Sequence, residues 1–407
     1  MELRPILSAM LRNRTGAVLV ALQVAITMAV LVNAAFIIND RMKLLAQPAG
    51  VDVDRIITIL IYAFDPNYDW DGERRQDLDA LRSLPGVEAA TTMNSLPLSD
   101  SGWSSGWLTE EGNVDSDVSS GMYMVDEFGL ETLGMELLEG RWFRADEVKI
   151  IDFTSGDDFV DSVIVTETLA KKMFPGESAV GKPLFLETGD SVTIVGVTSD
   201  VACPWPKFAE DEVGGLYNTT FLPGRGSPPV ARYVVRAGAD EAATLAPAIE
   251  KALTDRGSGR VVMNLKLHRE IVDETYGGDI AMIRMLVTVI VLLLAVTSLG
   301  VVGLASFNVR SRTKQIGTRR AVGARRRDIL RYFLLENAVM TGIGVALGTV
   351  LTFALNLWLV ENYDLARLDP TWVPLGILGL LLLGQIATLA PARRASLIPP
   401  AVATRTI

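Results

Sequence analysis

The sequence predicts a membrane α-helical protein with four transmembrane helices in a one-plus-three layout and a large α/β domain outside the membrane. Apolar residues make up 49% of the 407 residues and gather in four long runs. The net charge of −10 is unevenly divided: residues 39–279 hold 42 acidic and 21 basic residues, whereas residues 280–407 hold five acidic and fourteen basic residues. Because short basic segments stay on the cytoplasmic side of a membrane, these two parts are expected on opposite sides.

The first span is expected at residues 17–38, at the end of a segment, residues 1–38, that begins in the cytoplasm. The 22 residues of this span carry no charge, and at about 1.5 Å per helical residue they reach roughly 33 Å, enough to cross a bilayer. The run is too long for the apolar region of a cleaved signal peptide, and no A-x-A site follows it. Gln23 and Thr27 lie one turn apart and are expected to face other helices.

Residues 39–279 are expected to form the extracytoplasmic domain, an α+β fold with a β-α-β unit at each end. Two such units can build one ferredoxin-like or porter-like layer. The helix of the second unit is expected to be capped by Asp240. The predicted strands are 55–63, 87–93, 121–125, 161–166, 184–186, 191–197, 230–236 and 261–267. The predicted helices are 73–84, 167–174 and one that carries Leu245, Ile249 and Leu253, and residues 100–117 are expected to form a loop.

Residues 280–407 are expected to hold the other three spans, at about 285–307, 332–360 and 373–390, with Pro391 following the last. A cytoplasmic loop at 308–331 joins the first two of these spans, and an acidic connector at 361–371 joins the last two. With four spans, both termini and every basic cluster lie in the cytoplasm, while the acidic domain and the connector lie outside. A three-span arrangement would leave the basic loop or the basic tail outside.

The stretch of residues 308–337 carries the strongest functional pattern, with nine basic and two acidic residues. Topology or anionic lipid headgroups can explain the charge, but they do not explain the order of residues 315–324. That order predicts a short helix ending at Gly323, followed by three arginines that lead into the next span. Such an arrangement is typical of a docking element at a membrane surface.

Glu336 lies near the inner end of the third span. A carboxylate inside a membrane is costly and can mark an ion path. Here it lies about a turn from Arg331 and the interface, so we expect it to reach the interface or to be stabilised by the helix N-terminus. No other acidic residue lies deep in a predicted span, which disfavours a proton-coupled carrier.

Small residues in the spans are expected to let helices pack closely. Gly344 and Gly348 form a G-x-x-x-G pattern in the third span, and Gly300 and Gly303 lie in the second. The sequence leaves open whether these glycines pack within one subunit or between two.

The patterns for catalysis, nucleotides and metals are incomplete. Residues 176–182 match the first seven positions of a phosphate-binding loop, but Pro183 stands where Ser or Thr must ligate magnesium. His268 is the only histidine, and no hydrolase or metalloprotease motif accompanies it. Cys203 is the only cysteine, so we expect a buried side chain rather than an intermolecular disulfide. We therefore expect no catalytic site, no cofactor and no metal, which disfavours an anchored extracytoplasmic enzyme.

Residues 312–324 read R-T-K-Q-I-G-T-R-R-A-V-G-A and resemble the R-x-x-E-I-G-x-x-R-A-x-G-A segment of FtsX/MacB-type ABC permeases, the type VII ABC superfamily. Gln315 stands where the family usually has Glu, which removes a charge. Residues 140–143, 174–182 and 195–201 are similar to the family's G-R-x-F, F-P-G-x-x-x-x-G-K and G-V-x-x-D-V motifs. These motifs favour a MacB-like periplasmic core domain in front of an FtsX-like permease domain.

The resemblance implies a dimeric permease, homo- or heteromeric, in the bilayer of a bacterial inner membrane. It implies a separate dimeric ABC ATPase as the driving partner, with or without a periplasmic adaptor, and no nucleic acid. The second span would pass motion to the outer domain, in mechanotransmission or in export of a peptide, drug or lipid-linked cargo. A non-transporting signalling or division scaffold and a lipoprotein-releasing permease are the alternatives. The residues that the resemblance assigns to ATPase coupling are Arg312, Gln315, Ile316, Gly317, Arg320, Ala321, Gly323 and Ala324.

Overall fold

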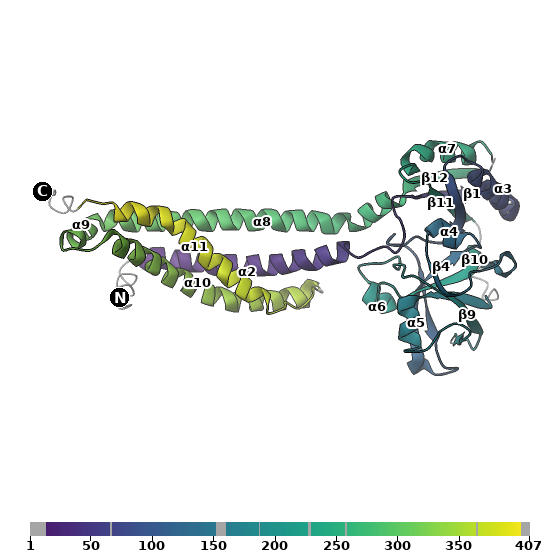
Figure 1. Ribbon diagram of the computed structural model, residues 1–407, viewed down its shortest axis with the longest axis horizontal. Coiled ribbons are helices and arrows are strands. Elements are labelled where there is room, and N and C mark those ends of the chain that lie inside the picture. Colours follow the sequence, from purple (N-terminus) through teal and green to yellow (C-terminus); the bar gives the residue numbers. More distant parts are fainter. Residues whose placement is uncertain are drawn as a thin grey trace. The chain divides into compact units, whose positions relative to one another are not determined.

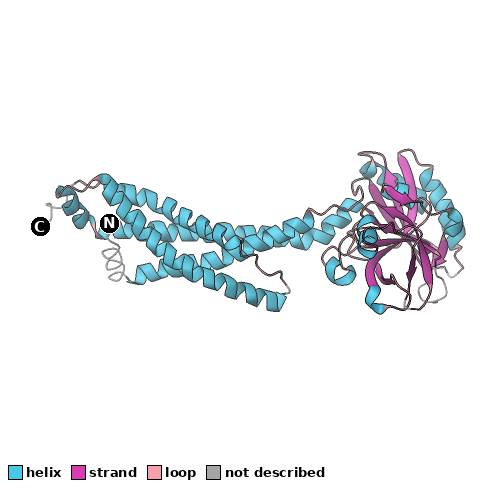
Figure 2. Cartoon of the chain, turned by 60° about the horizontal axis from the view of Figure 1, so that its bottom comes forward, coloured by secondary structure: helices cyan, strands magenta, loops and turns pink. Residues whose placement is uncertain are grey.

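The computed structural model describes most of the chain. The described residues are 14–65, 67–151, 160–186, 188–226, 229–256, 259–363 and 365–399. The expected cytoplasmic ends, residues 1–13 and 400–407, lie outside them. The chain divides into a helical unit, formed by the residues up to Lys43 together with those from Asp279 onward, and a second unit of residues 44–278. The described strands all belong to the second unit (Figure 2).

Among the described residues, four helices are long and apolar enough to cross a membrane (Figure 1). They are α2 (Arg14–Leu45), α8 (His268–Ser311), α10 (Arg326–Tyr363) and α11 (Trp372–Ser396). The short helix α9 (Thr313–Ala321) connects α8 to α10. All four predicted spans are therefore helical. Each helix extends beyond its predicted limits, because polar residues continue the helix past the apolar run.

Pro391 lies inside α11 rather than after it, contrary to the expectation from the sequence. The proline is buried, and Ala392 and Ala395 on the following turn pack in an apolar cluster with Ile329 and Phe333 of α10. Packing against a neighbouring helix therefore holds a turn that a proline alone would interrupt.

α2 packs against the other long helices of the helical unit. An apolar cluster joins Val24 and Met28 of α2 to Val301 of α8, Val345 of α10 and Leu380 of α11. α8 is the least covered of the four. Of its most apolar 18-residue stretch, 11% is buried, compared with 39% for the corresponding stretch of α2. Much of the apolar surface of α8 is therefore exposed.

The second unit contains a four-stranded antiparallel sheet in the order β12-β1-β11-β2. Its strands are β1 (Ile56–Ala63), β2 (Val87–Met93), β11 (Val230–Ala237) and β12 (Arg260–Leu267). Two helices, α3 (Trp70–Arg82) and α7 (Ala242–Thr254), cover one face. There Leu81 and Leu253 pack on the inward isoleucines of β1. This is the ferredoxin-like layer that the two β-α-β units predict.

The expected cap of α7 is absent. The residue before its first turn is Glu241, whose side chain makes no capping hydrogen bond. Asp240 instead has a φ of 60°, in the left-handed region that aspartate tolerates better than most residues. Asp240 therefore belongs to the turn between β11 and the helix and does not cap the helix.

A larger sheet has eight strands among the described residues, and six of them close into a barrel. The six run in the order β4-β3-β8-β9-β7-β10, and β10 also pairs with β4, while β6 pairs with β10 and β5 with β9. These strands are β3 (Trp103–Leu108), β4 (Asp117–Val125), β5 (Leu137–Gly140), β6 (Lys149–Ile151), β7 (Ser162–Thr166), β8 (Pro183–Phe185), β9 (Ser191–Thr198) and β10 (Thr219–Gly226). Three short helices, α4 (Gly129–Leu133), α5 (Glu167–Met173) and α6 (Ala209–Val213), complete the unit.

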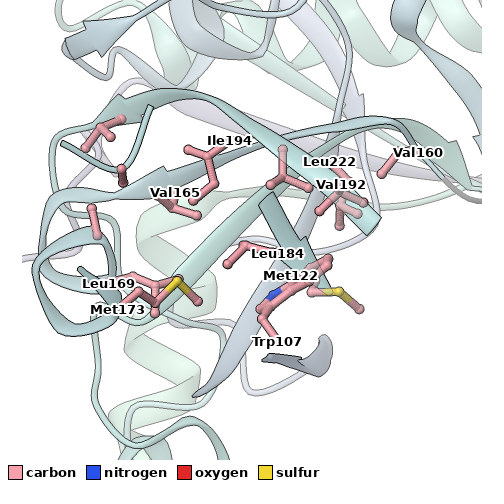
Figure 3. Packing of buried hydrophobic residues seen from close by; sticks show 14 of the residues in the cluster. Trp107, Met122, Val160, Val165, Leu169, Met173, Leu184, Val192, Ile194 and Leu222 are labelled. Atoms are coloured by element: carbon pink, nitrogen blue, oxygen red, sulfur yellow. The ribbon is translucent and has the colours of Figure 1, made fainter. Parts of the chain in front are cut away.

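Figure 3 shows the core of this barrel, in which Trp107, Leu184 and Ile194 pack together. Residues 103–108 form β3, although the sequence predicts a loop at 100–117. Trp107 is fully buried, and its indole N–H donates a 2.9 Å hydrogen bond to Ser120 Oγ on β4. Pairing with β4 along the whole of β3 and the buried indole therefore outweigh the low strand propensity of the Gly and Ser residues.

A third apolar cluster lies between the two sheets and joins Ile56 and Val234 of the smaller sheet to Tyr123 and Phe221 of the barrel. Cys203 is also fully buried, as the sequence predicts, and burial raises the pKa of its thiol to about 11. The thiol is therefore protonated and shielded from reagents at neutral pH.

Candidate functional site

The corner between α8 and α10 is built around α9, a helix of nine residues (Figure 1). After α9, the backbone N–H of Ala324 donates a 3.0 Å hydrogen bond to the carbonyl of Arg319. Gly323 has a φ of 104°, a conformation that favours glycine, so the turn lies where the sequence predicts it. Asp328 then accepts a 2.9 Å hydrogen bond from the backbone N–H of Arg325, which satisfies a donor at the start of α10.

One side of α9 packs on the chain itself. Ile316 is 4% exposed and lies in an apolar cluster with Ile329 and Phe333 of α10 and Ala395 of α11. Gly317, the next residue, is also buried. The middle of α9 is therefore fixed by apolar contacts against the start of α10 and the end of α11.

Arg312, at the N-terminal end of α9, forms an ion pair with Glu336 of α10. Its Nη1 lies 3.0 Å from Glu336 Oε2 and 3.4 Å from the hydroxyl of Tyr332. Glu336 is 2% exposed, so its carboxylate is covered by the neighbouring helices. It also lies ten residues inside α10, beyond the first turn to which the effect of a helix N-terminus is confined. A guanidinium on the neighbouring helix compensates the carboxylate instead.

Arg320, near the C-terminal end of α9, binds the end of α11. Its Nη1 donates hydrogen bonds of 3.2 Å to the carbonyl of Ser396 and 2.7 Å to the carbonyl of Ile398. The last carbonyls of a helix have no partner within the helix, and a cation there also meets the negative end of the helix dipole. The guanidinium therefore caps α11 from a different segment of the chain.

The other side of the corner is exposed and basic. Val322, at its tip, is 84% exposed, the highest value among the large apolar residues of the described chain. The guanidinium of Arg319 lies 5.1 Å from the ring centroid of Tyr332. Between positions 314 and 331, the exposed residues are Lys314, Gln315, Thr318, Arg319, Ala321, Val322, Gly323, Arg325, Arg326, Arg327 and Arg331. The corner thus exposes an apolar side chain, Val322, together with several cations of the same short segment.

The structure divides the predicted coupling residues into two sets. The inward set, which packs or pairs within the chain, is Arg312, Ile316, Gly317 and Arg320, with Ala324 partly buried beside them. The outward set is Gln315, Ala321 and Gly323. Sequence reasoning missed Val322, although an apolar residue among so many charges was a visible signal. It also missed Glu336 as the partner of Arg312, because 24 residues separate the two.

Three of the four predicted packing glycines contact α2 within the same chain. A Cβ at Gly344 would lie 2.7 Å from the carbonyl oxygen of Ala21, and one at Gly348 would lie 2.6 Å from Met28 Cβ. A Cβ at Gly300 would meet the side-chain oxygen of Gln23 at 2.5 Å, and this flexible side chain can move. The fourth glycine, Gly303, faces open space instead.

Gly303 lines an apolar groove of about 600 Å³ between α2 and α8. The groove also includes Leu22 and Ile26 of α2 and Val296 and Phe307 of α8. Across its floor the hydroxyls of Thr27 and Thr297 share a 2.8 Å hydrogen bond.

The rejected nucleotide and catalytic motifs serve the fold. Lys182, which would bind phosphate in a true phosphate-binding loop, pairs with Glu177 and lies 4.4 Å from the ring centroid of Phe174. The segment follows helix α5 rather than a strand. The ring of His268 is buried, and its Nε2 lies 2.7 Å from the carbonyl of Pro97. Within the described residues, no group of His, Cys, Asp and Glu could hold a metal ion.

Two family models match the chain. The model described as MacB-like periplasmic core domain matches residues 17–252, and the model described as FtsX-like permease C-terminal matches residues 287–400. This chain belongs to the MacB-like, FtsX-type family of ABC permeases. The α9 corner lies within the part that the FtsX-like model matches, and the four apolar helices with a periplasmic-type α/β domain fit an inner-membrane protein.

Curated relatives named macrolide export ATP-binding/permease protein MacB are similar over most of this chain. The relative from Chromobacterium violaceum is 26% identical over 296 residues, 70% of this chain and 43% of its own length. Those from Neisseria meningitidis serogroup A and Burkholderia pseudomallei are 28% and 26% identical and cover 74% and 84% of this chain, and 42% and 51% of themselves. The chain thus spans about half the length of these relatives.

Two solved structures are similar to part of the chain. The periplasmic region of MacB from Actinobacillus actinomycetemcomitans is 18% identical with a TM-score of 0.31, covering 55% of this chain and 94% of that one. The extracellular domain of the ABC-type transporter YknZ from Gram-positive bacteria is 17% identical with a TM-score of 0.30, covering 51% of this chain and all of that one.

Proposed function

We propose that the chain is the permease subunit of an ABC transporter and that the outward side of the α9 corner rests on a cytoplasmic ABC ATPase carried on a separate subunit. The observation that carries this proposal is the division of the corner, whose inward residues pack or pair within the chain while Val322 and the neighbouring arginines are exposed. An exposed apolar side chain with cations near it fits a partner surface that has an apolar depression bordered by acidic residues. The family supports such a partner, because it is a family of ABC permeases.

In this proposal, movement of the ATPase displaces α9 and reaches residues 44–278 through the helices that continue into them. α8 is one uninterrupted helix of 44 residues, which corresponds to about 66 Å at 1.5 Å per residue. A helix of that length can pass a displacement along its axis without cargo entering the bilayer. The α9 corner, the N-terminus and the C-terminus would lie in the cytoplasm of a bacterial cell, and residues 39–279 outside the inner membrane.

The exposed apolar side of α8 and the groove beside Gly303 provide a place for a second permease chain. This placement would cover apolar surface that is otherwise left to lipid. The curated relatives are named for macrolide export. For this chain we propose export of an apolar or peptide-like cargo, with a periplasmic adaptor as a further candidate partner. A scaffold that binds the ATPase without moving cargo is the second candidate.

The ATPase partner can be tested with the tagged full-length chain from membranes of its own bacterium, reconstituted in lipid nanodiscs. We expect an ABC ATPase to co-purify and its hydrolysis rate to change when the chain is present. Val322→Asp should abolish this effect, because it places a carboxylate at the apolar tip. The same change at Val114, which is 65% exposed in the second unit, serves as control. Equal effects of the two variants, or no ATPase at all, would contradict the proposal. Cargo movement into vesicles then separates a transporter from a scaffold.

The orientation can be tested with introduced cysteines, because the native Cys203 is buried and the pKa of its thiol is raised. Gln315→Cys reports the corner and Glu111→Cys reports the second unit, and both positions are exposed. In spheroplasts, a membrane-impermeant maleimide should label position 111 at once and position 315 only after permeabilisation. The reverse order would place the corner outside and exclude a cytoplasmic ATPase there.

A further inference from the structure

Two arginines of the predicted coupling segment point away from the surface that would meet an ATPase. Arg312 pairs with Glu336 of α10, and Arg320 donates to Ser396 and Ile398 at the end of α11. We propose that these two arginines are positioning residues that fasten α9 to α10 and α11, so that the three helices move as one body. This inference rests on the proposed function, and it assigns transmission of force, not recognition of the ATPase, to the arginines.

The two contacts hold opposite ends of α9. Arg312 precedes its first residue and Arg320 lies one residue before its last, and the buried Ile316 lies between them. A helix fixed at both ends and at its centre cannot tilt on its own without breaking a charged contact. A push on the exposed tip at Val322 is therefore shared with α10 and α11 rather than absorbed by rotation of α9.

The connection between α8 and α9 is short and not helical. Between Ser311, which ends α8, and Thr313, which begins α9, only Arg312 intervenes, with φ and ψ of −108° and 12° outside the helical range. The chain thus changes direction at the same residue that is bound to Glu336. The ion pair therefore fixes where α8 meets the body formed by α9, α10 and α11.

The body extends to α2 through close glycine contacts. A Cβ at Gly376 of α11 would lie 2.4 Å from a methyl group of Val32, and one at Gly348 of α10 would lie 2.6 Å from Met28. Such contacts leave little room for α10 and α11 to slide along α2. α8 is the exception, since it is the least buried of the four long helices. The movement that the ATPase starts is therefore expected to appear between α8 and the rest of the helical unit.

The first test needs no ATPase. Spin labels on Gln315→Cys of α9 and Leu397→Cys after α11, both exposed positions, report the distance between the two segments in nanodiscs. We expect one narrow distance distribution in the parent and a broadened distribution in Arg320→Ala and in Glu336→Gln. Arg326→Ala, which removes an exposed arginine of the same corner, should leave the distribution narrow. An unchanged distribution in both inward variants would overturn the proposal whether or not an ATPase binds.

The second test separates transmission from recognition. With the co-purified ATPase, Arg320→Ala and Glu336→Gln should leave binding unchanged, while stimulation of ATP hydrolysis falls roughly two- to thirty-fold, the range for mutations that disturb coupling between sites. Arg320→Lys, which keeps a cation but not the guanidinium geometry, should give an intermediate loss and covers the case in which the alanine variant does not fold. Loss of binding in the inward variants would show that these residues recognise the ATPase and would overturn the assignment. Failure of the parent to bind any ATPase would refute the proposed function and leave the first test to decide the positioning role.

Discussion

In each unit of the described chain an arginine pairs with a buried carboxylate, Arg260 with Asp77 and Arg312 with Glu336, and these two pairs are built differently. In the second unit, Arg260 Nη2 lies 2.9 Å from Asp77 Oδ1, and the Tyr233 hydroxyl donates a 2.9 Å hydrogen bond to the other carboxylate oxygen. The side chains of this pair are 1% and 0% exposed. In the helical unit, Arg312 meets Glu336 through one oxygen, and the arginine side chain is 17% exposed.

The difference lies in what each pair joins. Arg260 begins β12 and Asp77 lies on α3, so the first pair crosses a folded layer, and Arg260 also binds the carbonyl of Leu253 on α7. Both terminal nitrogens of that guanidinium bind other parts of the same domain. The second pair joins two consecutive helices at a corner and reaches solvent on one side. We infer that the first pair holds a fold and that the second holds a moving connection.

The largest effect is expected for Asp77→Ala, which would leave the buried Arg260 with only the 3.8 Å contact to Glu73 Oε2 as an ion pair. Breaking one partner of a buried pair costs about 3–5 kcal/mol, so the second unit should unfold at a much lower temperature. Thermal unfolding of the full chain, followed by tryptophan fluorescence, measures it. Asp79→Ala changes an exposed carboxylate on the same helix and should have little effect. Similar losses for both variants would remove the contrast between a fold-holding pair and a surface charge.

The next largest effect on stability is expected where α10 packs closely against α2 in the helical unit. A Cβ atom added at Gly344 would lie 2.7 Å from Ala21 O and 2.8 Å from Val24 Cβ, so the side chain of Gly344→Val has no room. Overpacking of this kind costs about 1–3 kcal/mol or more. Gly342→Val adds the same residue to the same helix in open space and provides the matched control. Unfolding in a denaturing detergent series should separate the two, and equal stability would mean that close glycine contacts do not hold α10 to α2.

A smaller effect on stability is expected for Glu336→Gln. The neutral amide still accepts a hydrogen bond from Arg312, and the partly exposed guanidinium can be hydrated, so we expect a loss of roughly 1.5 kcal/mol, the lower end of the range for hydrogen bonds to charged groups. The same detergent series measures it. A loss as large as that of Asp77→Ala would make both pairs fold-holding and would break the comparison.

The sequence predicts the local features of both units well. β2 has the predicted limits, and the apolar runs locate all four long helices. Gly323 marks the turn after α9 because only glycine adopts its φ of 104° readily. In each case the physical cause acts within a few residues of its signal, as in the pattern of one strand or the conformation of one turn.

What the sequence does not predict depends on contacts between distant segments. Arg320 and Ser396 are 76 residues apart, and nothing near either residue indicates that they meet. The consensus of the coupling segment contains both inward and outward residues. Successive residues of a helix point in different directions, so a short motif on the nine-residue helix α9 includes residues from both of its sides. β3 was missed for the same reason, since its strand character comes from pairing with β4 and from the buried Trp107.

The smallest effect is expected at a third pair, Asp54 and Arg269, which extends the comparison to the surface. Two hydrogen bonds of 2.7 Å join them, but their side chains are 64% and 47% exposed. Exposed pairs contribute about 0–1 kcal/mol, so Asp54→Asn should lower stability only slightly. The hydrogen bond from Arg269 lowers the pKa of Asp54 below its usual 3.8.

Because the folded-state pKa of Asp54 is lowered, the contribution of this pair is present above pH 3.8 and is lost as the pH falls through the lowered value. Salt should weaken it at any pH, because solvent reaches both groups. Unfolding curves of the parent and Asp54→Asn at low and high ionic strength should therefore converge at acid pH and in high salt. A difference that persists under both conditions would mean that the exposed pair stabilises the fold as the buried Arg260–Asp77 pair does. Burial would then not determine how much each of the three ion pairs contributes to stability.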